Sequence, residues 1–175
     1  MLNKVLQESI DRRELVELYV SREDFDKFEL VAPVAMGTEL LLAHDHTTAG
    51  VSDGFVVHLL DDVLAVGRGT RYIADRVERS VDRAAASPIF AKALGSWESL
   101  AQALIGAKEI VTIDFGDSWL IGQMVRADSE WVSARPFKFS QREFDGEMLI
   151  RWRDVEKITF GSRDEQAVAA TILGL

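Results

Sequence analysis

Apolar and polar positions alternate along this chain with two periods, one typical of helices and one typical of strands. Helical spacing in residues 2–12 predicts a short amphipathic helix. Alternation with period two then predicts strands in residues 14–20, 28–34 and 39–43, followed by a polar loop and by a strand, a tight turn and a strand between Gly54 and Gly69. Pro33 cannot donate a ladder hydrogen bond, so its end of the second strand should lie at an edge or a bulge.

A helical stripe returns after Gly69. It consists of Ile73, Val77, Val81 and Ala84, with Thr70 as a candidate N-cap, and it should stop before Pro88. Ser96 is expected to cap a further helix. The second part of the chain then repeats the strand pattern, with strands predicted at residues 109–115, 119–126 and 131–134, a second strand-turn-strand unit from Gly146 to Gly161, and a short final helix at 167–173.

The two strand-turn-strand units match each other residue by residue. At a spacing of 92 residues, identical residues coincide: Asp53, Gly54, Asp62, Val63, Gly69 and Arg71 fall on Asp145, Gly146, Asp154, Val155, Gly161 and Arg163. Upstream the spacing becomes 95 residues, and there Gln7, Ile10, Glu14 and Val16 fall on Gln102, Ile105, Glu109 and Val111. The apolar pattern stays in step with these identities, so we infer an ancient duplication.

The repeat predicts a mainly β fold with flanking α-helices. Each unit contains a helix and then five short strands, an order that fits two tandem five-stranded, strongly bent antiparallel barrels, each preceded by a helix. The predicted domains are a first barrel with its N-terminal helix at residues 1–69, a helical linker at 70–95, and a second barrel with its N-terminal helix and a short C-terminal helix at 96–175.

This arrangement resembles the Sm-like (LSm) fold, with a tandem duplication of the barrel, and it resembles uncharacterised bacterial proteins with Sm-like or SH3-like barrels. The stretch from Ile150 to Ile158, I-R-W-R-D-V-E-K-I, is similar to the second motif of that family. The resemblance implies the fold. The family holds uridine bases with an Asn and an Arg-Gly step, whereas this chain has Trp152 in place of the glycine and no arginine in His58-Leu59-Leu60.

The composition narrows the class of protein. Apolar residues make up 47% of the chain and only three prolines occur, as expected for a folded globular protein. Cysteine is absent, which excludes disulfides, thiol catalysis and cysteine metal sites. No apolar run reaches the ~18 residues that span a bilayer. We therefore expect a cytoplasmic protein that has no membrane partner.

Basic and aromatic residues gather in the second unit. Arg151, Arg153, Trp131 and Lys138 can stack and neutralise a nucleotide, so they are the nucleic-acid-binding candidates. The formal net charge of −9 works against such binding, because affinity for nucleic acid depends on cations that displace counterions. The favoured interpretation is that Trp131 and Trp152 close the core of the barrel.

Histidine occurs in one cluster, His44-Asp45-His46, and once more at His58. In an extended segment, His44 and His46 would point to the same side, and His58 on a neighbouring strand would complete a zinc-like ligand set. The second unit has Pro136, Lys138 and Ile150 at these places, so the site would belong to one unit only. The expected cofactor is none, with these histidines as the metal alternative.

No residue pattern supports catalysis. There is no nucleophile elbow, no Walker loop and no Rossmann glycine series. The preferred hypothesis is therefore a non-catalytic interaction or assembly module, not an enzyme, that binds a protein partner or itself. The alternatives are an RNA-binding protein that uses the second barrel, and a metal-binding protein that uses His44, His46 and His58.

Overall fold

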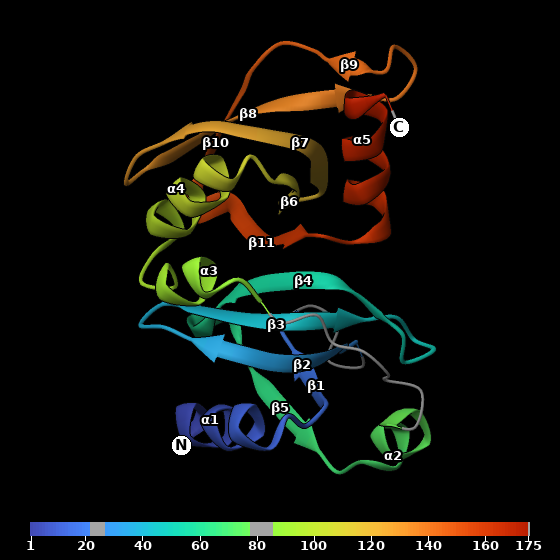
Figure 1. Cartoon of the computed structure of the whole chain (residues 1–175). Helices are drawn as coiled ribbons and strands as arrows, with labels where there is room; N and C mark the ends of the chain where they lie inside the picture. Colours follow the sequence, from blue (N-terminus) through green and yellow to red (C-terminus); the bar gives the residue numbers. More distant parts are fainter. Residues whose placement is uncertain (22–26, 78–85, 175) are drawn as a thin grey trace.

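The computed structural model describes residues 1–21, 27–77 and 86–174 (Figure 1). It is a mainly β molecule in which helices flank an antiparallel sheet. The first half contains α1 (Leu2–Arg12), β1 (Val16–Tyr19), β2 (Glu29–Met36), β3 (Leu40–His46), β4 (Ser52–Leu59), the 3-10 turn η1 (Leu60–Asp62), β5 (Ala65–Arg68) and α2 (Arg71–Val77).

The second half repeats this order. It contains α3 (Pro88–Lys92), α4 (Trp97–Ala107), β6 (Ile110–Phe115), β7 (Ser118–Ala127), β8 (Trp131–Lys138), β9 (Glu143–Phe144), β10 (Met148–Arg151), the 3-10 turn η2 (Trp152–Asp154), β11 (Val155–Phe160) and α5 (Arg163–Leu173). In Figure 1 the two halves lie one above the other, with α3 between them.

All but one of these strands follow each other in one open sheet, in the order β10-β8-β7-β6-β11-β4-β3-β2-β1-β5; the short β9 pairs only with β8. With the short β9 left out, each half contributes five strands in the same order, with its fourth strand (β4 or β10) at one end and its fifth strand (β5 or β11) at the other. The halves meet where β11 pairs with β4. The structure therefore joins the halves edge to edge, in one sheet that does not close.

The predicted hairpins are wrong in their pairing. The strands exist, but β4 does not pair with β5, and β10 does not pair with β11. The connections are the 3-10 turns η1 and η2, which turn the chain away from the preceding strand, so that β5 pairs with β1 and β11 pairs with β6. The polar loop predicted at residues 44–53 is also shorter than expected, because β3 extends to His46 and β4 begins at Ser52.

Most other local predictions are confirmed. Ser96 caps α4 by accepting a hydrogen bond from the Ser99 amide at 3.2 Å. A register shift next to Pro33 is the predicted bulge in β2. Helix α5 begins at Arg163, earlier than predicted, because Ser162 and Glu165 form a capping box. Of the helical stripe after Thr70, Val81 and Ala84 lie outside the described residues.

The largest apolar cluster belongs to both halves. It joins Leu40, Leu42 and Val57 of the first half to α3, α4 and the inner side of the second half. A smaller cluster fills the first half beneath α1 and includes Leu6, Leu18 and Val56. Since consecutive residues of β3 and β4 belong to different clusters, this part of the sheet is buried on both faces. None of the described helices is long and apolar enough to cross a membrane.

Candidate functional site

The junction between the halves is a short antiparallel pairing. Its register partners are Phe55 with Phe160, Val56 with Thr159, Val57 with Ile158, and His58 with Lys157. Val57 and Ile158 have no exposed surface. Because the two strands belong to different repeats, this junction displays how the fourth-strand edge of one unit fits the fifth-strand edge of another.

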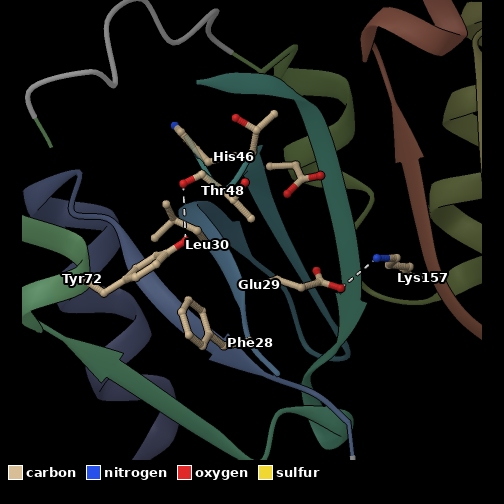
Figure 2. Close-up of a pocket in the computed structure, with 9 residues that line it drawn as sticks. Phe28, Glu29, Leu30, His46, Thr48, Tyr72 and Lys157 are labelled. Carbon is tan, nitrogen blue, oxygen red and sulfur yellow. Dashed lines mark hydrogen bonds and ion pairs between the residues drawn. The ribbon is translucent and has the colours of Figure 1, made fainter. Parts of the chain in front are cut away.

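One end of the junction is charged. Lys157 Nζ donates to Glu29 Oε1 at 2.7 Å, and His58 Nε2 lies 2.8 Å from Glu29 Oε2. Asp114 adds a longer contact to Lys157, at 3.9 Å. Figure 2 shows Glu29 and Lys157 reaching toward each other from opposite halves. This charged set, Glu29, His58, Asp114 and Lys157, takes two residues from each half.

Burial and charge act against each other on these groups. Burial alone would raise the pKa of Glu29, but its hydrogen bond to His58 and the charges of His58 and Lys157 lower that pKa to about 2. Burial likewise opposes the charge of Lys157, whose pKa is nevertheless raised by Glu29 and Asp114. Burial raises the pKa of Asp114. Glu29 and Lys157 are therefore a carboxylate and an ammonium at neutral pH.

The other end of the junction is aromatic. The rings of Phe55 and Phe160 stack with their centroids 5.3 Å apart. His44 lies against the other side of Phe55 at 4.4 Å, and Phe90 of α3 meets Phe160 edge-on at 5.0 Å. Ring contacts of this kind contribute about 0.5–1.5 kcal/mol each beyond area burial.

A pocket of about 270 Å³ opens beside the charged end (Figure 2). It is lined by Phe28, Glu29, Leu30, Asp45, His46, Thr47, Thr48, Tyr72 and Lys157. The Tyr72 hydroxyl donates to the Thr48 carbonyl at 3.4 Å, and the Arg76 guanidinium covers the Tyr72 ring at 3.4 Å. Burial raises the pKa of Asp45 in this wall. The pocket therefore combines acidic groups with an aromatic wall, in which the Tyr72 ring is already covered by Arg76.

The structure does not bring the three histidines together. His44 stacks on Phe55, which shares a face of the sheet with Val57, whereas His58 is the next residue along and points to the opposite face. His46 lines the pocket. Among the residues that the structure describes, no group of three histidine, aspartate or glutamate side chains is placed to hold a metal ion.

The structure also separates the candidate nucleic-acid-binding residues from one another, except for Arg151 and Trp131. Arg151 and Trp131 are register partners, and the guanidinium lies 4.6 Å from the ring centre. Arg153 is exposed in η2 beside Asp154, and Lys138 lies at the far end of β8, roughly 20 Å along the strand from Trp131. Trp152, by contrast, is buried: it stacks on Trp97 at 6.0 Å, and its indole donates to the Asp128 carbonyl at 2.7 Å.

Two strand edges lie open at the ends of the sheet. Within the described ranges, β10 pairs only with β8, and β5 pairs only with β1. The repeat makes Leu149 of β10 the counterpart of Val57. Val57 has no exposed surface, whereas Leu149 is 58% exposed. The second unit therefore presents an apolar edge at the position that the first unit covers with its partner strand.

Sequence reasoning missed Glu29, Asp114 and Lys157, because their roles depend on strand pairing across the two halves. The local sequence around Lys157, Val-Glu-Lys-Ile-Thr-Phe at residues 155–160, mixes polar and apolar residues and does not single out this lysine. No protein-family model, no curated protein and no solved structure matches this chain.

Proposed function

We propose that this protein is a non-catalytic assembly module, built from two Sm-like barrels, that joins copies of itself head to tail through the open edges of its sheet. The observation that carries this proposal is the β4·β11 junction together with the two open edges. The chain pairs one fourth-strand edge with one fifth-strand edge, and it leaves the other fourth-strand edge and the other fifth-strand edge available.

The β4·β11 pairing within the chain, the internal junction, supplies a register for the proposed pairing between copies, the external junction. Ile158 pairs with Val57, and their counterparts in the repeat are Val66 and Leu149. We therefore place Leu149 of one copy opposite Val66 of the next. This pairing removes the exposed Leu149 side chain from water and supplies the open edges of both strands with hydrogen-bond partners.

The proposed interface uses two different surfaces, so every added copy leaves one β10 edge and one β5 edge open. Interfaces of this heterologous kind produce closed rings when the rotation per copy closes, and filaments when it does not. Assembly should therefore extend beyond a dimer. The exposed Leu149 on the β10 edge supports this reading, because an unpaired strand edge with apolar side chains is a template for pairing with another chain.

Sedimentation velocity at several protein concentrations tests the proposal. The unmodified protein should sediment as a species larger than one chain, and Leu149→Asp should raise the dissociation constant at least ~10-fold by placing a charge in the apolar pairing. The matched control is Leu173→Asp, which makes the same substitution at a position on α5 that is 71% exposed and away from both edges. The control should assemble as the unmodified protein does.

A single-chain mass at every concentration would overturn the proposal, and so would equal assembly of Leu149→Asp and the control. In either case, titration with mixed-sequence single-stranded RNA becomes the next measurement. Binding that weakens steeply with salt, and that is lost when Arg151 and Arg153 are both replaced by Ala, would favour the RNA alternative.

A further inference from the structure

The internal junction and the proposed external junction have opposite characters at both ends. This contrast rests on the proposed assembly and on the repeat, which assigns a counterpart to every residue of the β4·β11 pairing.

At the charged end of the internal junction, the external junction is apolar. The counterparts of His58 and Lys157 are Ile150 and Ala65. Equivalent register positions put Leu120 in place of Glu29, because Leu18 pairs with Glu29 as Ile113 pairs with Leu120. In the same way Tyr19 takes the place of Asp114, because Ala65 pairs with Tyr19 as Lys157 pairs with Asp114.

At the aromatic end of the internal junction, the external junction is charged. The counterparts of Phe160 and Phe55 are Arg68 and Glu147, which the transferred register places opposite each other. Arg68 is held between Glu8 at 3.0 Å and Glu14 at 2.8 Å, and Arg12 lies 3.6 Å from the same Glu14, so these four groups balance in charge. Glu147 lies 2.7 Å from Arg126 and near Arg135, a group with a net charge of +1. The complementarity at this end is therefore between the Arg68 guanidinium of one copy and the Glu147 carboxylate of the next.

The wrong pairings would be mismatched at both ends. If β4 paired with β5 of another copy, His58 and Glu29 would lose Lys157 and face Ala65, while Arg68 would face Phe55. If β10 paired with β11 of another copy, Lys157 would be buried against Ile150, while Glu147 would face Phe160. In the second case Lys157 would keep only its 3.9 Å contact to Asp114. Burial of a charge that has lost its closest partner is unfavourable, whereas the correct pairings keep the Glu29–Lys157 ion pair.

We infer that the charged residues at one end of each junction, together with the aromatic or apolar residues at its other end, select which strand edges pair. The selection directs β4 to β11 within a chain and β10 to β5 of the next copy. It acts while chains fold at high concentration, when edges of different copies meet before the internal junction has closed.

Disulfide trapping tests the selection directly, because the chain contains no cysteine. Two full-length variants are mixed in denaturant, refolded together and oxidised. Leu149→Cys with Val66→Cys reports the correct external pairing, and Val57→Cys with Val66→Cys reports the wrong one. We expect the first cross-link and not the second. In a background that also carries Glu29→Leu, His58→Ile and Lys157→Ala, the wrong cross-link should rise at least ~10-fold.

The outcomes separate the two proposals. Absence of the correct cross-link would contradict the assembly itself. Formation of both cross-links in the otherwise unmodified chain would leave the assembly intact and overturn the selection. If the triple background does not fold, Lys157→Ala alone replaces it. This substitution makes β11 resemble β5 at that position, and it should raise the wrong cross-link in the same direction; no rise would contradict the inference.

Discussion

At the scale of single residues, Glu29 holds the charged end of the junction together. Its two carboxylate oxygens are used separately, one by His58 of its own half and one by Lys157 of the other half. Removing either His58 or Lys157 leaves the bond to the other, but removing the carboxylate leaves a largely buried ammonium with only the 3.9 Å contact to Asp114. The junction therefore depends more on Glu29 than on either of its partners.

Glu29→Gln should lower the free energy of unfolding at neutral pH by roughly 2 kcal/mol. The pKa of Glu29 falls from 4.5 to about 2 on folding, so its contribution is complete above pH 4.5 and is lost as the pH falls toward 2. The difference between the two proteins should therefore shrink through that window. Urea unfolding followed by tryptophan fluorescence at several pH values measures it. A difference that stays constant with pH would show that the carboxylate charge is not the cause.

Substitution of glycine by alanine should have opposite effects on stability at Gly37 and at Gly106. A Cβ on Gly37 would lie 2.0 Å from the backbone oxygen of Leu94, where nothing flexible can move aside. Gly37→Ala should therefore destabilise the protein by about 1–3 kcal/mol. A Cβ on Gly106, in α4, meets nothing within 4 Å, so Gly106→Ala should stabilise by about 0.5 kcal/mol. Thermal unfolding of both variants gives the sign of each effect, and a stabilised Gly37→Ala would contradict the packing of this turn against Leu94, which lies between α3 and α4.

At the scale of elements, the cap of α4 is a local interaction that can be tested by itself. Ser96 Oγ accepts the Ser99 amide, one of the amides that the first helical turn leaves unpaired. Ser96→Ala should cost about 1 kcal/mol of stability, whereas Ser96→Asp retains an acceptor and should stay within a few tenths of a kcal/mol of the unmodified protein. Equal losses in urea unfolding would mean that the cap is not the source of the effect.

Element positions could be predicted because local pattern decides them. The stripe of Leu2, Leu6 and Ile10 gives α1, and the alternation in Val111 and Ile113 gives β6. The pairing of strands could not be predicted in the same way. A tight connection between two strands usually indicates a hairpin, but here the connections are 3-10 turns that redirect the chain. The local sequence determines where the chain turns, whereas the pairing partner of each strand depends on the arrangement of the whole sheet.

The candidate site could be predicted even less. The histidines were singled out by residue type and spacing, yet His44 and His58 lie on opposite faces, a consequence of register that the spacing does not reveal. Arg151 and Trp131 belong to one candidate set, but only the strand pairing shows that they are register partners. The charged set was missed because Glu29 and Lys157 are 128 residues apart, and only the pairing of β4 with β11 brings them together.

At the scale of the whole molecule, the two halves share one apolar core. The largest apolar cluster contains Leu40 and Val57 from the first half and Leu100 and Ile158 from the second. The charged set likewise draws on both halves. Separation of the halves would expose the apolar face of β4 and leave the charged set incomplete, so neither half should unfold while the other stays folded.

The distribution of aromatic residues allows this to be measured. All four tryptophans lie in the second half, whereas both tyrosines lie in the first, so tryptophan fluorescence reports one half and far-ultraviolet circular dichroism reports both. We expect the two signals to give coincident urea transitions in the unmodified protein. Val57→Ala should lower the free energy of unfolding by about 1–3 kcal/mol, and with it the urea midpoint of both signals, because its side chain is fully buried at the junction between the halves. Transitions that separate in the unmodified protein would mean that the halves unfold independently, in which case the shared cluster and the β4·β11 pairing contribute less than the cores within each half.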